Sequence, residues 1–258
     1  MKGLAVVTGA SSGIGATFAR KLAGQGFRLL LVARRRDRLE QLAGELNGGT
    51  EILAADLSEE DAQRALAERL TGDEDLQLLV NNAGFGTLGR FFAIGLESQE
   101  RMHRLHVMAT VRLTHAALSG MVKRNRGAVI NVSSVAAFAQ SPGNVSYCAT
   151  KAWMNAFTTA LDLELRSVAS AVKVQALCPG FTYSEFHDTM GADRNRIPRS
   201  LWLSSDYVVD ESLRALDRDK VVVIPAWRYK AIAAFIKRMP RMVLRSGSIR
   251  YSERAGRA

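Results

Sequence analysis

The sequence predicts an α/β protein whose single domain is built on a doubly wound, parallel seven-stranded sheet. Short apolar runs rich in Val, Leu and Ile alternate along the chain with longer stretches of helical periodicity. Glycine or polar clusters follow directly after several of these apolar runs. The 258 residues suffice for one sizeable domain, and neither an internal repeat nor a low-complexity linker divides them.

The strands are predicted from continuous apolar runs, which are typical of strands that are buried on both faces. They are expected at residues 4–7, 27–33, 51–55, 76–80, 128–132, 173–177 and 221–224. Helices are expected at residues 13–23, 35–46, 98–123 and 146–168, and a further helix is expected after Ser58 as its N-cap. Right-handed crossovers place the loops that follow parallel strands at one edge of the sheet, where ligands bind.

Composition argues against several classes of protein. The two cysteines, Cys148 and Cys178, are too few for a disulfide framework, and the four histidines show no metal-ligand spacing. The apolar run near the N-terminus is too short for a signal peptide, and no stretch is long enough to span a bilayer. The expected location is therefore the cytoplasm.

The net charge of +10 is unevenly distributed along the chain. Residues 227–258 carry nine Lys or Arg and one Glu, a net charge of +8, which leaves +2 for residues 1–226. We expect a nearly neutral domain at residues 1–226 and a basic amphipathic extension at residues 227–258.

A glycine-rich stretch, TGASSGIG at residues 8–15, lies between the first predicted strand and the first predicted helix. Glycines there permit a tight turn and a close approach of the backbone to a pyrophosphate, which then lies at the helix N-terminus. The stretch predicts a dinucleotide site. The expected contacts in it are Gly9, Ser11, Ser12, Gly13, Ile14 and Gly15.

The ends of the second and third strands predict which dinucleotide binds. A carboxylate after the second strand would bind the ribose 2′-hydroxyl of NAD, but this chain has Arg34, Arg35 and Arg36 there. Because arginine pairs with a 2′-phosphate, the expected cofactor is NADP(H), with Arg34 and Arg35 as contacts; a solvated basic helix start is the alternative. Asp56 can accept a hydrogen bond from the adenine amino group, with Leu57 beside it, or can cap the next helix.

Tyr147 and Lys151 are four residues apart in a predicted helix, so their side chains share one face. A cation there favours the phenolate and is expected to lower the tyrosine pKa from about 10 toward working pH. Such a phenol can exchange a proton with a carbonyl or alcohol oxygen, which the hydroxyl of Ser134 can hold. The three residues predict an enzyme that moves a hydride and a proton together.

With NNAG at residues 81–84 and PG at residues 179–180, these motifs resemble the classical type of short-chain dehydrogenase/reductase over roughly residues 3–225. The resemblance implies a Rossmann-like fold, NAD(P)-dependent oxidoreduction, and dimers or tetramers formed through the two long helices. It implies Tyr147 as proton donor, Ser134 as carbonyl orienter, and Lys151 as partner of the tyrosine and the nicotinamide ribose. Asn81 would brace the sheet. The further cofactor contacts it implies are Asn82, Ala83, Gly84, Pro179, Gly180, Thr182 and Ser184.

The chain departs from the family pattern at His106, where the family usually has a catalytic asparagine. In the family this asparagine shapes the helix so that a backbone carbonyl holds a water linking the lysine to solvent. Histidine could keep the bend, relay the proton itself with a pKa near neutral, or break the relay. We expect retained activity with an altered pH profile; a tolerated substitution without consequence is the alternative.

Residues 181–203 are expected to form a lid over an apolar substrate. The expected pocket residues are Phe181, Phe186, Met190, Leu201 and Trp202, with Phe85, Phe91 and Phe138 from neighbouring loops. The lid arginines, Arg194, Arg196 and Arg199, either meet an acidic group of the substrate or keep the loop solvated. His187 is expected to be an ordinary lid residue.

The basic extension has a helical apolar stripe, formed by Tyr229, Ile232, Ala233, Ile236 and Met239. A helix of this kind can lie on an anionic membrane surface, or it can pack on the parent domain or on another subunit. No interleaving of aromatic and basic residues favours a nucleic acid.

The function that the sequence favours is NADP(H)-dependent reduction of an apolar ketone or aldehyde, ketoacyl-like or steroid-like, to an alcohol. One alternative is a non-catalytic NADP(H)-binding sensor or scaffold protein, against which the intact Ser134, Tyr147 and Lys151 speak. Another is an epimerase or dehydratase of the extended branch, which the glycine spacing and the C-terminal region do not fit.

Overall fold

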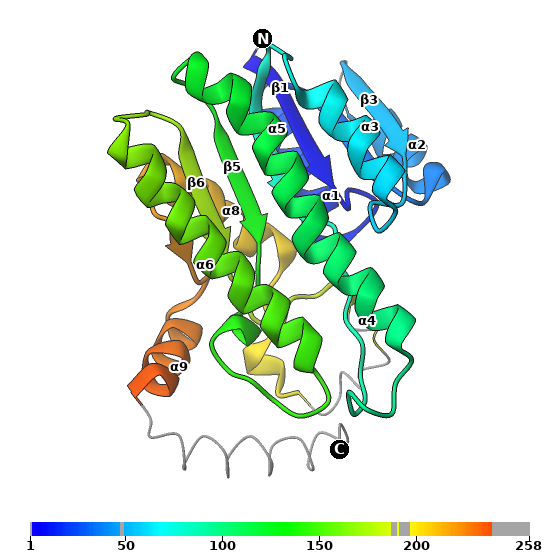
Figure 1. Ribbon diagram of the computed structural model, residues 1–258, viewed down its shortest axis with the longest axis vertical. Coiled ribbons are helices and arrows are strands. Elements are labelled where there is room, and N and C mark those ends of the chain that lie inside the picture. The colour runs from blue at the N-terminus through cyan, green and yellow to red at the C-terminus, as the bar shows by residue number, and fades with distance from the viewer. Residues whose placement is uncertain (1, 47–48, 187–189, 191–196, 239–258) are drawn as a thin grey trace.

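The computed structural model describes residues 2–46, 49–186, 190 and 197–238, and it has a seven-stranded sheet in the order β3-β2-β1-β4-β5-β6-β7 (Figure 1). Every neighbouring pair of strands is parallel. The strands are β1 (Lys2–Thr8), β2 (Phe27–Ala33), β3 (Thr50–Ala54), β4 (Leu76–Asn81), β5 (Ala128–Val132), β6 (Lys173–Leu177) and β7 (Val222–Val223). The predicted Rossmann-like doubly wound sheet is confirmed.

Helices cover both faces of this sheet; in Figure 1, α5 and α6 lie across the face toward the viewer and α8 lies behind. The helices are α1 (Gly13–Gly24), α2 (Arg36–Glu45), α3 (Glu60–Leu70), α4 (Leu96–His103), α5 (Thr110–Lys123), α6 (Val145–Ser167), α8 (Ser205–Asp217) and α9 (Trp227–Arg238). Short 3-10 turns are η2 (Val135–Ala137) and η4 (Arg199–Leu201). The sequence interpretation missed α8, although the Ser204 hydroxyl caps it by accepting from the Tyr207 N–H.

Two hydrophobic cores result, one on each face of the sheet, because successive side chains of a strand point to opposite faces. In β1, Val7 packs with α1, α2 and α8, whereas Val6 packs with α3, α5 and α6. The five inner strands, β2, β1, β4, β5 and β6, are therefore buried on both sides, which explains their continuous apolar sequences.

The long helix predicted at residues 98–123 is interrupted by one π-helical segment, η1 (Arg104–Ala109), between α4 and α5. The inserted turn holds His106, whose side chain is fully buried. π-helical turns inside α-helices occur frequently at functional sites.

The prediction that Ser58 is the N-cap of α3 is wrong. Glu59 precedes the first residue of α3 without a side-chain cap, and the Ser58 hydroxyl instead donates to Asp56 Oδ1 at 2.8 Å. The Ser58 side chain is directed to Asp56 because a hydroxyl donor makes a strong hydrogen bond with an ionised acceptor.

Candidate active site

One cavity of about 790 Å³ lies at the carboxyl edge of the sheet. Residues that follow β1 to β6 line it, and one helix at the end of the described chain, α9, closes it. This edge is where the strand order reverses on either side of β1, the usual ligand-binding position in open α/β sheets. The volume falls within the range of small-molecule and cofactor sites.

The glycine loop between β1 and α1 is held by the loop after β4. Asn82 Nδ2 donates to the carbonyl oxygens of Thr8 and Gly9, at 2.9 and 3.1 Å. A Cβ added to Gly15 would lie 2.2 Å from the Gly9 oxygen, so only glycine allows this turn to close. The cradle fits a pyrophosphate, because the first turn of α1 then faces it with free N–H groups.

The asparagine before this loop has the bracing position that the family resemblance implies. Asn81 is buried, and its Nδ2 donates to Asn131 Oδ1 at 2.9 Å and to the Thr114 hydroxyl at 3.1 Å. The amide thus ties β4 to β5 and to α5 beneath the cavity.

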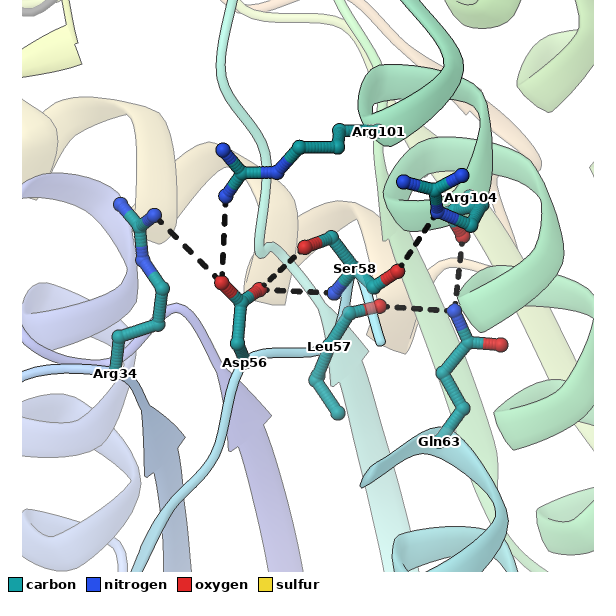
Figure 2. Close-up of polar contacts among 7 residues, drawn as sticks. All are labelled: Arg34, Asp56, Leu57, Ser58, Gln63, Arg101 and Arg104. Atoms are coloured by element: carbon teal, nitrogen blue, oxygen red, sulfur yellow. Dashed lines mark hydrogen bonds and ion pairs between the residues drawn. The ribbon is translucent and has the colours of Figure 1, made fainter. Parts of the chain in front are cut away.

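Asp56 lines the cavity and lies close to two arginines, Arg34 and Arg101 (Figure 2). Its Oδ1 accepts from the N–H and hydroxyl of Ser58, while Oδ2 lies 3.8 Å from Arg34 and 3.4 Å from Arg101. Burial opposes ionisation, but the Ser58 hydrogen bonds and the two arginines hold the pKa of Asp56 below its ordinary value. Both carboxylate oxygens of Asp56, the expected adenine contact, therefore already have partners within the protein.

The loop at residues 56–58 is fixed by α3 and η1 (Figure 2). Gln63 Nε2 donates to the carbonyl of Leu57 at 2.9 Å and to that of Arg104 at 3.1 Å. Arg104 Nε in turn donates to the Ser58 carbonyl at 3.1 Å. Arg101 could not be assigned to this site from the sequence, because only tertiary packing of α4 brings it near Asp56.

Arg35 lies across the glycine loop and pairs with a residue that sequence analysis missed, Glu185. Its Nη2 lies 3.1 Å from the Ser11 hydroxyl, 3.2 Å from the Ser12 hydroxyl and 2.8 Å from Glu185 Oε2. The Arg35 hydrogen bond holds the pKa of Glu185 below its ordinary value. Arg34, by contrast, has a largely exposed side chain whose partner is Asp56.

Ser134, Tyr147 and Lys151 meet in the middle of the cavity. Tyr147 and Lys151 lie one turn apart on α6, and the Lys151 Nζ is 5.8 Å from the centre of the Tyr147 ring. Lys151 donates to the Val132 carbonyl at 2.7 Å. Ser134 follows β5, where its oxygen accepts from the Ala136 N–H at 3.1 Å, and it hydrogen-bonds the Tyr147 hydroxyl.

The pKa values of Tyr147 and Lys151 are determined more by burial than by the attraction between the two side chains. Burial raises the pKa of Tyr147 to about 12, opposed by its hydrogen bond with Ser134. Burial also lowers the pKa of Lys151 to about 8. The expectation of a lowered tyrosine pKa is thus wrong for the protein alone, because desolvation disfavours the phenolate more than the surroundings stabilise it.

His106 has both ring nitrogens engaged. Nε2 accepts from the Phe85 N–H at 3.2 Å, so the proton is assigned to Nδ1, which lies 3.0 Å from the Thr150 hydroxyl. A Cβ on Gly84 would lie 2.9 Å from Nε2, so glycine leaves room for this ring. Burial, then the charges of Lys151 and His103, hold the pKa of His106 well below its ordinary value.

The bend at His106 is therefore kept, as a π-helical turn around a neutral imidazole. A proton relay with a pKa near neutral does not match this environment. Of the outcomes left open by the sequence, the geometry supports retention of the helix shape.

The segment after β6 is anchored to α9 and to the glycine loop. The Phe181 N–H donates to the Tyr229 hydroxyl at 3.0 Å, and a Cβ on Gly180 would lie 2.1 Å from the Tyr229 ring. At the other end, Ser184 Cβ lies 2.8 Å from the position that a Cβ on Gly13 would take. Pro179, Gly180, Thr182 and Ser184 all line the cavity, as do the expected contacts Ile14, Ala83 and Gly84.

The apolar end of the cavity differs from the predicted pocket in two residues. Trp202 stacks on Tyr183 instead, with ring centres 4.9 Å apart, and Phe91 is exposed. The lining residues that were expected are Phe85, Phe138, Phe181, Phe186, Met190 and Leu201. His187, Arg194, Arg196 and Met239 lie outside the described residues, and Arg199 is exposed.

α9 supplies a wall of the cavity that sequence analysis did not assign. Its residues Tyr229, Ile232, Ala233 and Ile236 line the cavity, and Tyr229 also donates to the Leu201 carbonyl. They belong to the predicted helical stripe of the basic extension, and of the alternatives left open for that stripe, the described residues follow packing on the parent domain.

Comparison with known proteins places the chain among the short-chain dehydrogenases. A family model described as short chain dehydrogenase matches residues 3–195. Nodulation protein G of Rhizobium sp. (strain N33) is 35% identical over 187 residues, which cover 72% of this chain and 76% of that protein. Serine 3-dehydrogenase of Agrobacterium fabrum (strain C58) is 35% identical over 189 residues, covering 72% and 74%.

Among solved structures, the short-chain dehydrogenase from Sphingobium yanoikuyae in complex with NADPH is similar with a TM-score of 0.83 and 34% identity. The match covers 93% of this chain and 97% of that one. The chain therefore belongs to the classical short-chain dehydrogenase/reductase family. It is an oxidoreductase with a nucleotide-binding Rossmann fold that acts on alcohol or carbonyl groups.

Two further findings concern the part of the chain that the structure describes. Residues 2–46, 49–186, 190 and 197–238 contain no group of His, Cys, Asp or Glu that could hold a metal ion. Within the same ranges, no helix is long and apolar enough to cross a membrane.

Proposed function

We propose that this chain is an NADP(H)-dependent reductase of apolar ketones or aldehydes, running reversibly, with Tyr147 as the proton donor. The observation that carries the proposal is the meeting of Ser134, Tyr147 and Lys151 in one cavity, between a glycine cradle and an apolar wall. The catalytic domain is residues 1–226, and α9 of the extension completes the substrate end.

The residues of the cradle fit a nicotinamide dinucleotide. The glycine loop and Asn82 would hold its pyrophosphate side, and Thr182 and Ser184 would lie near its nicotinamide end. Arg34 and Arg35 support a 2′-phosphate, because no acidic residue follows β2 where a 2′-hydroxyl would need one. The bound dinucleotide supplies a hydride to the carbonyl carbon, or accepts one from the alcohol carbon.

The protein residues would handle the proton. A substrate oxygen placed beside the Tyr147 and Ser134 hydroxyls accepts a hydrogen bond from Ser134 and the proton from Tyr147. With a pKa of about 12, Tyr147 is protonated at neutral pH and ready to donate. The nearby Lys151 ammonium stabilises the phenolate that this transfer leaves behind.

The substrate end supports an apolar molecule. Its walls come from three parts of the chain: the turn after β5, the segment after β6, and α9. Aromatic and aliphatic side chains exclude water around the reacting carbonyl, which strengthens the hydrogen bonds that hold its oxygen.

The decisive experiment follows the oxidation of NADPH, with NADH in parallel, against ketones, aldehydes and β-ketoacyl thioesters. We expect turnover with NADPH, and loss of turnover with retained NADPH binding in Tyr147→Phe. The matched control is Tyr207→Phe on α8, whose side chain is 38% exposed and away from the cavity lining. Full activity of Tyr147→Phe would remove the assignment, and tight binding without any turnover would favour a sensor or scaffold.

We further propose a homodimer or homotetramer in the cytoplasm. Apolar side chains exposed on the long helices support this, with Leu163 of α6 at 64% and Val122 of α5 at 37% exposed. Light scattering of the purified protein tests the assembly, and Leu163→Glu should reduce the measured mass.

A further inference from the structure

α9, the last helix that the structure describes, has two apolar faces, and the described residues cover only one of them. Tyr229 and Ala233 are buried against the domain, and Ile236 lines the cavity. On the opposite face, Trp227 is 79% exposed and Phe235 is 66% exposed. An uncovered aromatic pair of this kind on a short helix indicates a surface that meets something apolar.

The spacing of the uncovered side chains makes them one continuous strip. Trp227, Ala231, Ala234 and Phe235 are separated as i, i+4, i+7 and i+8, which places them on one side of a helix. All four are exposed. We call these four residues the outer face of α9.

Positive charge flanks the outer face. Lys230, Lys237 and Arg238 are exposed, and α9 contains no Asp or Glu. By sequence, residues 239–258 add five Arg and one Glu. The surroundings of the outer face therefore attract an anionic partner and repel a second copy of the same basic surface.

Other exposed apolar side chains lie at the same edge of the sheet. Phe91, Phe92 and Leu96 follow the carboxyl end of β4, and Phe92 is 83% exposed. α9 follows the carboxyl end of the parallel strand β7, and Figure 1 shows α9 and α4 both beyond the arrowheads of the strands. The apolar surface is thus concentrated at the end of the molecule that contains the cavity.

We propose that the outer face of α9 docks this protein onto an anionic lipid bilayer surface. Tryptophan and phenylalanine enter the boundary between headgroups and acyl chains, while the flanking lysines and arginines pair with anionic headgroups. The helix lies in the plane of the surface, because its exposed aromatic side chains form a strip along one side of the helix axis.

This arrangement places the substrate cavity next to lipid. Ile232 lines the cavity and is also 45% exposed, so it joins the inner wall to the outside at α9. An apolar ketone or alcohol dissolved in the bilayer would reach the cavity past this side chain. The docking itself does not depend on the proposed reaction.

The test is flotation of the full chain with vesicles of phosphatidylcholine, alone or mixed with phosphatidylglycerol. We expect binding to the anionic vesicles only, weakened by salt. The double variant Trp227→Ser/Phe235→Ser should lower the partition coefficient about tenfold or more. Lys230→Glu/Arg238→Glu, at two exposed cations of α9, should weaken binding similarly by removing positive charge.

Two control variants lie near the opposite edge of the sheet. Val168→Ser removes an apolar side chain that is 64% exposed, and Lys123→Glu reverses an exposed charge; both should bind like the wild type. Thermal unfolding and NADPH binding verify that each variant is folded.

The proposal would be overturned if the protein did not bind anionic vesicles, or if the Trp227→Ser/Phe235→Ser variant bound them as well as the wild type. A change of oligomeric state in that variant would also overturn it, because the outer face would then belong to a contact with a second copy. Binding to an RNA or DNA duplex that matches the vesicle binding and depends on the same aromatic pair would also count against a lipid surface.

Discussion

His106 Nδ1 lies 3.0 Å from the Thr150 hydroxyl, which itself donates to the Tyr147 carbonyl at 3.0 Å. On the other side of the ring, Nε2 accepts from the Phe85 N–H. A neutral imidazole therefore joins the loop after β4 to the turn of α6 that carries Tyr147. This position lets His106 set where Tyr147, the proposed proton donor, lies, although His106 itself does not line the cavity.

The first prediction concerns the stability that follows from this buried imidazole. The folded-state pKa of His106 is depressed, so the unfolded chain binds more protons as the pH falls below about 6.5. The free energy of unfolding should be at its full value above that pH and should decrease below it, by up to about 1.4 kcal/mol per pH unit until the folded-state pKa is reached. In His106→Asn the decrease should be shallower.

Urea unfolding between about pH 7 and pH 5 measures this slope. His115→Asn, an exposed histidine on α5, is the control and should leave the slope unchanged. If His106 relays protons, the pH profile of kcat/KM should lose an inflection in His106→Asn. We expect no such loss: the kcat/KM profiles of the wild type and of His106→Asn should have the same shape.

The second prediction is a loss of reductase activity at alkaline pH. Lys151 carries its charge below its pKa of about 8, and it is neutral above it. The value of kcat/KM should fall as the pH rises through about 8, because the phenolate formed on Tyr147 then loses its cationic neighbour. Tyr147, with a pKa of about 12, remains protonated over this range and adds no inflection.

The variant Lys151→Arg keeps a positive charge at this position but replaces the amine that loses its proton near pH 8. Arginine stays protonated, so the alkaline fall should disappear or shift upward even if the overall rate is lower. The pH dependence of NADPH binding gives a second readout when turnover is weak. If Lys151→Arg kept the same decrease above about pH 8 in both kcat/KM and NADPH binding, the decrease would belong to a group other than Lys151.

The third prediction concerns the ion pair between Arg35 and Glu185. If Arg35 meets the 2′-phosphate, the Glu185 carboxylate 2.8 Å from it repels that phosphate. Glu185→Gln should therefore tighten NADPH binding several-fold and leave NADH binding nearly unchanged. Arg35→Ala should weaken NADPH binding about tenfold or more, the effect of losing a charge-assisted hydrogen bond.

Titration calorimetry with both dinucleotides provides the measurement. The control is Glu45→Gln, which removes an exposed carboxylate 2.7 Å from Arg20 and far along α2 from the cavity lining. Equal changes for NADPH and NADH in Glu185→Gln would mean that the pair acts on the loop shape and not on the phosphate.

The sequence predicts those parts of this molecule that are encoded locally. Buried parallel strands need continuous apolar runs, and the turn into α1 needs Gly9 and Gly15, so both are visible without a structure. The spacing of Tyr147 and Lys151 is likewise a property of one helix.

Contacts between distant segments are not encoded locally, and they account for what the sequence analysis missed. Glu185 lies 150 residues from Arg35, and Arg101 lies 45 residues from Asp56. The raised pKa of Tyr147 depends on its depth in the fold, which spacing does not reveal. The stripe of α9 was visible, but only packing shows that it lines the cavity.

The last prediction tests α9 as part of the active site. The Tyr229 hydroxyl accepts from the Phe181 N–H and donates to the Leu201 carbonyl, and both of these residues line the cavity. Tyr229→Phe keeps the ring against Gly180 and removes only the hydroxyl. It should lower the free energy of unfolding by about 1 kcal/mol, because a partly buried N–H and a partly buried carbonyl each lose this hydrogen bond.

The same change should raise KM several-fold and alter kcat less, because the cavity wall loosens while Ser134, Tyr147 and Lys151 stay in place. Steady-state kinetics together with urea unfolding measure both effects, and Tyr207→Phe on α8 serves as the matched control. A variant that is destabilised but has an unchanged KM would limit Tyr229 to holding the fold. A raised KM would make the C-terminal helix a determinant of substrate binding, and would predict that substitutions at Ile232 and Ile236 alter which carbonyl compounds are accepted.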